Sequence, residues 1–179
     1  MYRPDAQPVA TLSRARIEEL LVKHTIVSDL NMEAVDLSGA ELRGRNFYGC
    51  NFATLTYHTG SVHECSFELC FFPFSSISSV RFDGCQFRNC VFGCAELKQV
   101  TFVGSNVIQC SFNGCGAQSL EFNDCDLLHS RFDAAKFHET LIENCNLKQT
   151  RFVRTDTREV RFKYSNQEDA IFVAEETYW

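Results

Sequence analysis

The sequence predicts an all-β solenoid in which the chain turns after every five residues around a narrow interior. The main observation is an unbroken five-residue period of large apolar residues. Every fifth residue from Met32 to Phe172 gives a set of 29, of which 26 are large and apolar or aromatic. Fifteen of the chain's 17 Phe lie in this register. A period of five fits neither the 3.6-residue repeat of a helix nor the two-residue repeat of a strand, so the chain must turn regularly.

Small residues and turn residues occupy fixed places in the same period. Two places before each large residue the side chain is mostly small, as at Ala40, Cys50 and Ser75. Six of the nine Gly stand two places after the large residue, where a type II turn needs a positive φ. Pro73 occupies the preceding place, which suits such a turn. One large and one small residue of each unit should therefore line the interior, while the other three places face outward.

The ten cysteines follow the same grid, and nine of them stand at multiples of five. This regular placement is unlike a disulfide framework or a zinc motif, and a buried Cys packs as a small hydrophobe. We therefore expect free thiols, with oxidation between stacked cysteines as the alternative. A metal site built from Cys90 and Cys94 is not expected, because Cys90 should point inward and Cys94 outward.

Units such as Ala40-Glu41-Leu42-Arg43-Gly44 and Cys85-Gln86-Phe87-Arg88-Asn89 resemble the pentapeptide repeat family over about residues 31–174. The resemblance implies a right-handed quadrilateral parallel β-helix with four units, or 20 residues, in each of about seven coils. Residues 20 apart should then stack, which the sequence can test. One such column reads Met32, Phe52, Phe72, Phe92, Phe112, Phe132, Phe152 and Phe172, and a small column reads Cys50, Cys70, Cys90, Cys110, Ser130, Thr150 and Ala170. This sorting favours a 20-residue coil.

The two ends are expected to differ from the coils. Residues 12–24 carry apolar side chains at amphipathic helix spacing, with Thr11 or Ser13 as the N-cap. We expect residues 1–30 to form an extended segment and a helix that caps the first coil; a partner-binding helix is the alternative. The repeat should span residues 31–174, with a tail at 175–179. In that tail Tyr178 and Trp179 are expected to cover the last coil or to contact a second copy, so a homodimer stays open.

Charge and composition exclude several classes of protein. A net charge of -6 and a pI of about 5.4 argue against direct nucleic-acid binding through a basic face. No apolar stretch approaches the roughly 20 residues of a membrane span, and the first ten residues lack the apolar region of a signal peptide. No Walker loop, zinc-protease motif or nucleophile elbow is present, and the histidines should face solvent. We therefore expect no catalytic residue, no cofactor, no metal and no membrane contact, and a cytoplasmic location.

One outward cluster is apolar. The two Phe outside the register, Phe71 and Phe74, flank Pro73, and Val91 and Cys94 should lie one coil further along the same face. Polar residues surround them. Because an exposed apolar patch with a polar rim often marks an interaction site, these five residues form the candidate protein interface. Local self-packing is the alternative.

The leading functional hypothesis is a non-enzymatic bacterial protein-binding or scaffold module that acts through the faces of a rigid rod. The resemblance implies one alternative, a topoisomerase (gyrase) binding protein that mimics DNA and gives quinolone resistance or toxin immunity. Residues 31–167 carry 15 acidic and 13 basic side chains, and this balance weakens the alternative because a DNA mimic needs a sustained acidic stripe. A secreted effector module is a further alternative, for which the first 30 residues leave little room for a targeting segment. The sequence does not identify the protein partner.

Overall fold

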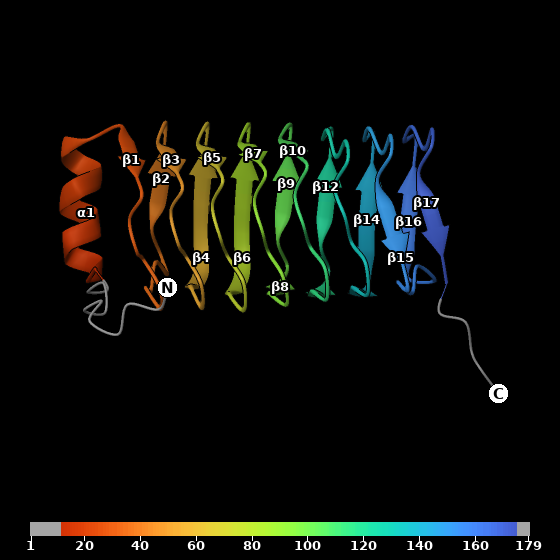
Figure 1. Ribbon diagram of the computed structural model, residues 1–179, viewed down its shortest axis with the longest axis horizontal. Coiled ribbons are helices and arrows are strands. Elements are labelled where there is room, and N and C mark those ends of the chain that lie inside the picture. Colours follow the sequence, from red (N-terminus) through yellow and green to blue (C-terminus); the bar gives the residue numbers. More distant parts are fainter. Residues whose placement is uncertain (1–11, 175–179) are drawn as a thin grey trace, which may run out of the picture.

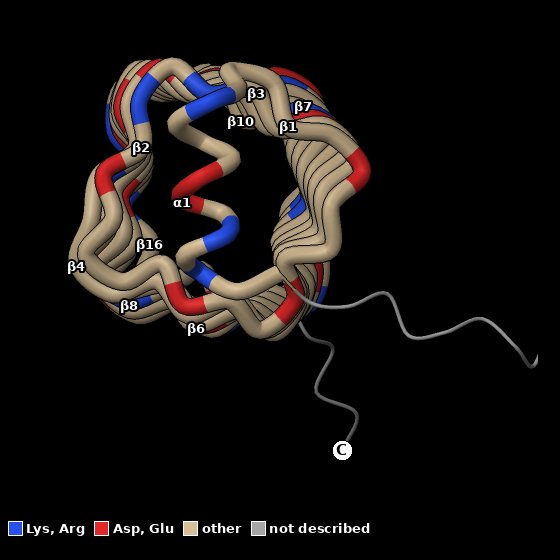
Figure 2. The backbone as a smooth tube through the Cα atoms, turned by 90° about the vertical axis from the view of Figure 1, so that its left-hand side faces the viewer, with Lys and Arg blue, Asp and Glu red and all other residues tan. Residues whose placement is uncertain are grey.

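Five-residue units wind into a right-handed rod with four faces, and residues 20 apart in the sequence lie on successive coils (Figure 1). The computed structural model describes residues 12–174, which form about seven coils and one helix. Seen along the rod axis, the coils superimpose in a four-sided outline, and the helix crosses the N-terminal opening (Figure 2). The expected parallel β-helix with an N-terminal capping helix is therefore confirmed.

The four faces, numbered I to IV in chain order, are built from parallel pairings that join residues 20 apart, such as Phe47 with Phe67. Face I contains β1 (Ile26–Ser28), β3 (Asn46–Tyr48), β5 (Ser66–Glu68), β7 (Gln86–Arg88) and β10 (Asn106–Ile108). Face II is held mainly by isolated bridges such as Phe71 with Val91, and ends in β15 (Arg151–Val153) and β17 (Ile171–Val173). Strand pairing begins at β1, inside the segment 1–30 that the sequence assigned to the extension and helix.

Faces III and IV share one ten-stranded sheet, because two long strands run around the corner between them without a break. These are β4 (Thr56–His63) and β6 (Ser76–Asp83). The other strands of this sheet are β2 (Glu41–Arg43), β8 (Glu96–Lys98), β9 (Thr101–Val103), β11 (Gly116–Gln118), β12 (Glu121–Asn123), β13 (Lys136–His138), β14 (Thr140–Glu143) and β16 (Val160–Lys163).

The interior of the rod is filled by stacked phenylalanine rings. On face II the rings of Phe92 and Phe112 lie with centroids 4.7 Å apart and planes 2° from parallel, and Phe132 continues the stack at 4.9 Å. Neighbouring columns meet edge to face, as in the contact between Phe112 and Phe122 at 6.0 Å. Stacked and edge-on pairs of this kind add to the free energy gained by burying the rings. The predicted Phe column is therefore confirmed.

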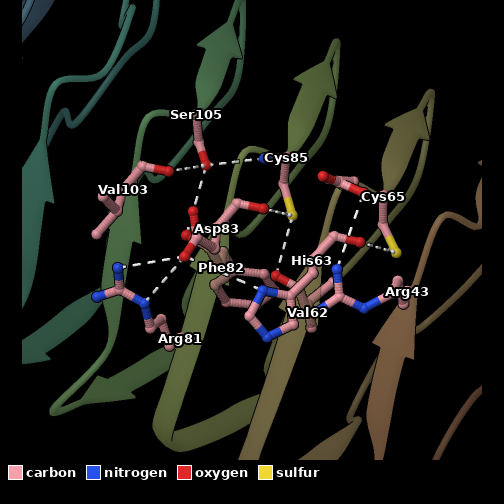
Figure 3. Close-up of polar contacts among 11 residues, drawn as sticks. Arg43, Val62, His63, Cys65, Arg81, Phe82, Asp83, Cys85, Val103 and Ser105 are labelled. Atoms are coloured by element: carbon pink, nitrogen blue, oxygen red, sulfur yellow. Dashed lines mark hydrogen bonds and ion pairs between the residues drawn. The ribbon is translucent and has the colours of Figure 1, made fainter.

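The small inward residues make a recurring hydrogen bond that explains their identity. Most of the inward Cys, Ser and Thr donate to the backbone carbonyl of the residue 23 positions earlier: Cys85 to Val62 at 3.3 Å, shown in Figure 3, and Ser130 to Val107 at 2.6 Å. The buried Thr140 hydroxyl is an exception that has no partner among residues 12–174. A buried carbonyl without a partner is costly, so a small side chain with a donor is favoured at this place. Cys, Ser and Thr meet that need, which is why they sort into the small columns.

The chain turns through residues with positive φ, as predicted. The six predicted Gly turn residues have φ between 54° and 77°, and most other units place a non-Gly residue at the same position. The predicted type II turn is closed by a hydrogen bond in only part of this set. Its closing hydrogen bond forms in the units of Gly39, from Ala40 N–H to Leu37, and Gly114, from Cys115 N–H to Phe112. At Gly44, Gly49, Gly84 and Gly104 the chain bends without it, although the N–H of every one of these glycines bonds to the next coil, as at Gly39 and Gly114.

The N-terminal helix α1 (Arg14–Lys23) lies within the predicted range and covers the first coil. Ser13 is its N-cap, and the Ser13 side chain accepts a hydrogen bond from Arg16 N–H at 3.4 Å. The alternative cap, Thr11, lies outside the described residues. Ile17 and Leu21 are the buried residues of the helix. Within residues 12–174, no helix has the length and apolar character needed to cross a membrane.

Candidate protein interface

The polar side chains of the described residues do not assemble into a reactive centre. Residues 12–174 contain no group of three or more His, Cys, Asp or Glu that could hold a metal ion. The Nδ1 atom of His58 lies 2.6 Å from the Ser78 hydroxyl on the next coil, and His63 lies 4.0 Å from Asp83. Each of these pairs lies on the outer surface of the rod and lacks the further partner that would orient a nucleophile and its base.

The thiols are placed for packing rather than for chemistry. All ten are free, nine are buried, and Cys94 alone is exposed, so the expected free thiols are found. Burial raises the pKa of Cys85 to about 11 and that of Cys115 to about 12. A thiol with such a pKa stays protonated near neutral pH and is a weak nucleophile and metal ligand. Cys85 and Cys115 therefore act as small core residues.

The structure brings the five residues of the candidate interface together on two adjacent coils of face II. Phe71 bridges Val91 in the parallel ladder, and the Phe74 N–H donates to the carbonyl of Gly93 at 3.0 Å. Phe71 is 47% exposed and Phe74 is 67% exposed. Pro73 and Val91 are half-buried, and Cys94 is exposed, as the outward register requires. We call Phe71, Pro73, Phe74, Val91 and Cys94 the apolar patch.

The apolar patch differs from most other exposed apolar side chains in its place along the rod; Tyr48, 45% exposed on β3, is an exception, because β3 pairs with both β1 and β5. Val22 and Ile26 lie at the N-terminal end, and Tyr164 and β17 lie at the C-terminal end, where coils lack a neighbour. The patch lies in the middle of the rod, so an end effect does not explain its exposure. Sequence reasoning missed Leu69, which is 39% exposed at the corner next to Phe71. A bulky apolar residue at a positive-φ turn place was the available signal.

A shallow hollow of about 430 Å³ lies on the outside of face III and was also missed. Gly116, Lys98 and Lys136 are among the residues that line it. The Glu96 carboxylate folds over Gly116 and fills the place where a Cβ would stand. A glycine at the outward place between the inward Cys115 and Ala117 was the sequence signal.

The other predicted contact residues, Tyr178 and Trp179, lie outside the described residues. The last described strand, β17, belongs to face II and pairs with β15 only. Ile171, Phe172 and Val173 are 44%, 41% and 44% exposed.

Comparisons with known proteins concern the repeat and its fold. A family model described as "Pentapeptide repeat region" matches residues 75–152. No curated protein sequence gives a significant match to the chain. Among solved structures, the fold is similar to Rfr23, a pentapeptide repeat protein from the cyanobacterium Cyanothece 51142. The TM-score is 0.51 at 10% identity, and the match covers 87% of this chain and 96% of that one.

A second solved structure, full-length QnrB1, is a plasmid-mediated fluoroquinolone resistance protein. It matches with a TM-score of 0.45 at 15% identity, covering 78% of this chain and 83% of that one. At these identities the likeness concerns the fold alone.

Proposed function

Because the chain belongs to the pentapeptide repeat family, we propose that it is a non-catalytic protein-binding module whose contact surface is the apolar patch on face II. The observation that carries the proposal is the exposure of Phe71 and Phe74 in the middle of the rod, where each coil has neighbours on both sides. Burying the exposed parts of these rings against a partner would gain about 25 cal/mol per Å² of apolar surface. A flat, rigid face also loses little conformational entropy on binding.

The alternative proposal, topoisomerase binding by DNA mimicry, has weaker support. Acidic side chains on the faces form ion pairs with basic side chains on the same surface. Asp83 lies 3.3 Å from Arg81, and Glu168 lies 3.2 Å from Lys148. Such pairs break up the sustained negative stripe that a basic DNA-binding groove would recognise. The likeness to QnrB1, at a TM-score of 0.45, adds no support. Inhibition of gyrase supercoiling, or protection of gyrase from a quinolone, would establish this alternative.

The proposal is tested by comparing two double variants in partner capture. Phe71→Ser with Phe74→Ser removes the aromatic side chains of the patch. Ile26→Ser with Tyr164→Ser is the matched control, because these residues occupy the same places of their units as Phe71 and Phe74 and are 67% and 86% exposed. Both variants leave the stacked core untouched and should keep the circular dichroism of the parent chain.

We expect proteins captured by the immobilised parent chain, measured by quantitative mass spectrometry, to be lost from the patch variant and retained by the control. Sedimentation of the two variants gives the same comparison for self-association. If every captured protein and the oligomeric state are the same for both variants, the patch is not an interface. A cytoplasmic location is part of the proposal, and fractionation of the source cells tests it.

A further inference from the structure

We infer that face II recognises an acidic chain segment of the partner protein, which lies along the rod with apolar side chains on the patch and carboxylates on a cluster of arginines. This inference rests on the proposed function and adds the chemistry of the partner. The arginine cluster consists of Arg131, Arg151 and Arg154 on the two coils before β17.

The distribution of charge along face II is the first argument. Over four successive coils, the outward places of face II within 51–54, 71–74, 91–94 and 111–114 hold no charged side chain. The next two coils hold the three arginines and one acidic residue, Asp133. Beyond its first coil, which carries Glu33, face II therefore has an uncharged part and then a part with two surplus positive charges, although the whole chain carries -6. A segment with an apolar part and an acidic part is complementary to this order.

Two guanidinium groups of the arginine cluster are positioned by one carboxylate. Arg131 Nη2 lies 2.7 Å and Arg151 Nη2 lies 3.6 Å from the same Asp133 oxygen. The Asp133 side chain is only 16% exposed and also accepts a hydrogen bond from the Val153 N–H, so one carboxylate positions two guanidinium groups. Arg154 is exposed and makes no ion pair within residues 12–174. The Nε atom of Arg151 is buried without a hydrogen-bond partner there.

The distance between the apolar patch and the arginine cluster sets the spacing between apolar and acidic side chains in the bound segment. Successive coils lie about 4.8 Å apart, so Val91 and Arg131 are separated by two coils, or about 10 Å. An extended chain advances about 3.3 Å per residue, which places about two residues between an apolar side chain and the first carboxylate. Ser111, Asn113 and Gly114 lie between the apolar patch and the arginine cluster and offer no large side chain that would hold a backbone away.

A protein segment fits this surface better than a nucleic acid does. Nucleic-acid binding needs positive charge along the whole contact, because each phosphate is charged. The uncharged part of face II would leave several phosphates unpaired against Phe71 and Phe74. A chain segment can instead place apolar and acidic side chains at separate positions.

The inference is tested with defined peptides and NMR. The probe is an acetylated heptapeptide with Phe and Ile, a Gly-Ser spacer and three Glu; matched probes carry three Gln or three Lys instead. Each is titrated into the ¹⁵N-labelled full chain at low salt. We expect the acidic probe to shift amide signals at 71–94 and at 131–154, to bind at least fivefold more tightly than the Gln probe, and to weaken as salt screens the charges.

Two charge reversals locate the effect. Arg154→Glu should weaken the acidic probe about fivefold or more, because a repulsion replaces an attraction at an unpaired position. Arg161→Glu is the matched control on face IV, since Arg161 is also exposed and makes no ion pair within the described residues, and it should change affinity less than twofold.

Several results would overturn the inference. The first is equal binding of the Glu and Gln probes, and the second is no detectable binding of any probe. The third is an equal effect of Arg154→Glu and Arg161→Glu. Each of these would contradict the recognition of an acidic segment by face II. Tighter binding of a 12-nucleotide single strand at the arginine cluster would point to a nucleic acid. These results leave the capture experiment on Phe71 and Phe74 standing, so a failure of the inference is distinguishable from a failure of the proposed function.

Discussion

Removing one ring from the middle of the phenylalanine column should destabilise the rod far more than removing one from its end. Phe112 is 1% exposed and stacks between two rings, at 4.7 Å and 4.9 Å, with further edge contacts on Phe102 and Phe122. Phe112→Ala therefore opens a closed cavity and should lower the free energy of unfolding by about 3–5 kcal/mol.

Phe172 is the matched control in the same column. It is 41% exposed and has one stacked neighbour, Phe152 at 5.0 Å, so part of its surface is already in water and no closed cavity forms. Phe172→Ala should lower the free energy of unfolding by about 1–2 kcal/mol.

Urea unfolding, followed by circular dichroism and by tyrosine fluorescence, measures both variants. Two probes are needed because repeat arrays can unfold in more than one step. Equal losses for the two variants, within about 0.5 kcal/mol, would refute a column in which each ring is held by the coils before and after it.

Three further predictions concern the interior. Gly60→Ala should cost about 1–3 kcal/mol, because its new Cβ would lie 2.5 Å from the Tyr57 ring and 2.7 Å from the Ala40 carbonyl; chemical unfolding checks this, and an unchanged midpoint contradicts it. Ellman's reagent should titrate one thiol, Cys94, in the native chain and nine more only after unfolding, whereas several fast native thiols would show an open core. Stability should stay constant up to about pH 9 and fall as pH rises further, because burial holds the pKa of Cys85 at about 11 and only the unfolded chain releases that proton near pH 9; a thermal midpoint that is flat to pH 11 contradicts this.

The coil could be predicted because a solenoid is nearly one-dimensional. Each residue's surroundings are set by its place in the unit and by the residues 20 positions before and after it. The stacking of Phe92 on Phe112 and the burial of Cys85 follow from that register alone. Both are visible in the sequence as columns of like residues.

Other features depend on local geometry that the period does not encode. Gly39 and Gly44 occupy the same place and both bond to the next coil, but only the turn at Gly39 closes with a hydrogen bond. The ring of Tyr57 fills the space that a Gly60 side chain would need, which requires the direction of one side chain to be known.

The candidate interface was predicted as a set of residues, since outward places follow from the register. The corner residue Leu69 was not, because exposure at a turn depends on how the two faces meet. The shared pairing of Arg131 and Arg151 with Asp133 was also beyond sequence reasoning, since it needs side-chain distances.

Photo-crosslinking from face II tests the central claim, that the middle of the rod contacts a partner, most directly. p-Benzoylphenylalanine placed at Phe74 should give a discrete covalent adduct with the partner in irradiated cells. The same residue placed at Tyr164, the equivalent turn place at the end of the rod, should give none. An adduct from position 164 with none from position 74 would contradict the account.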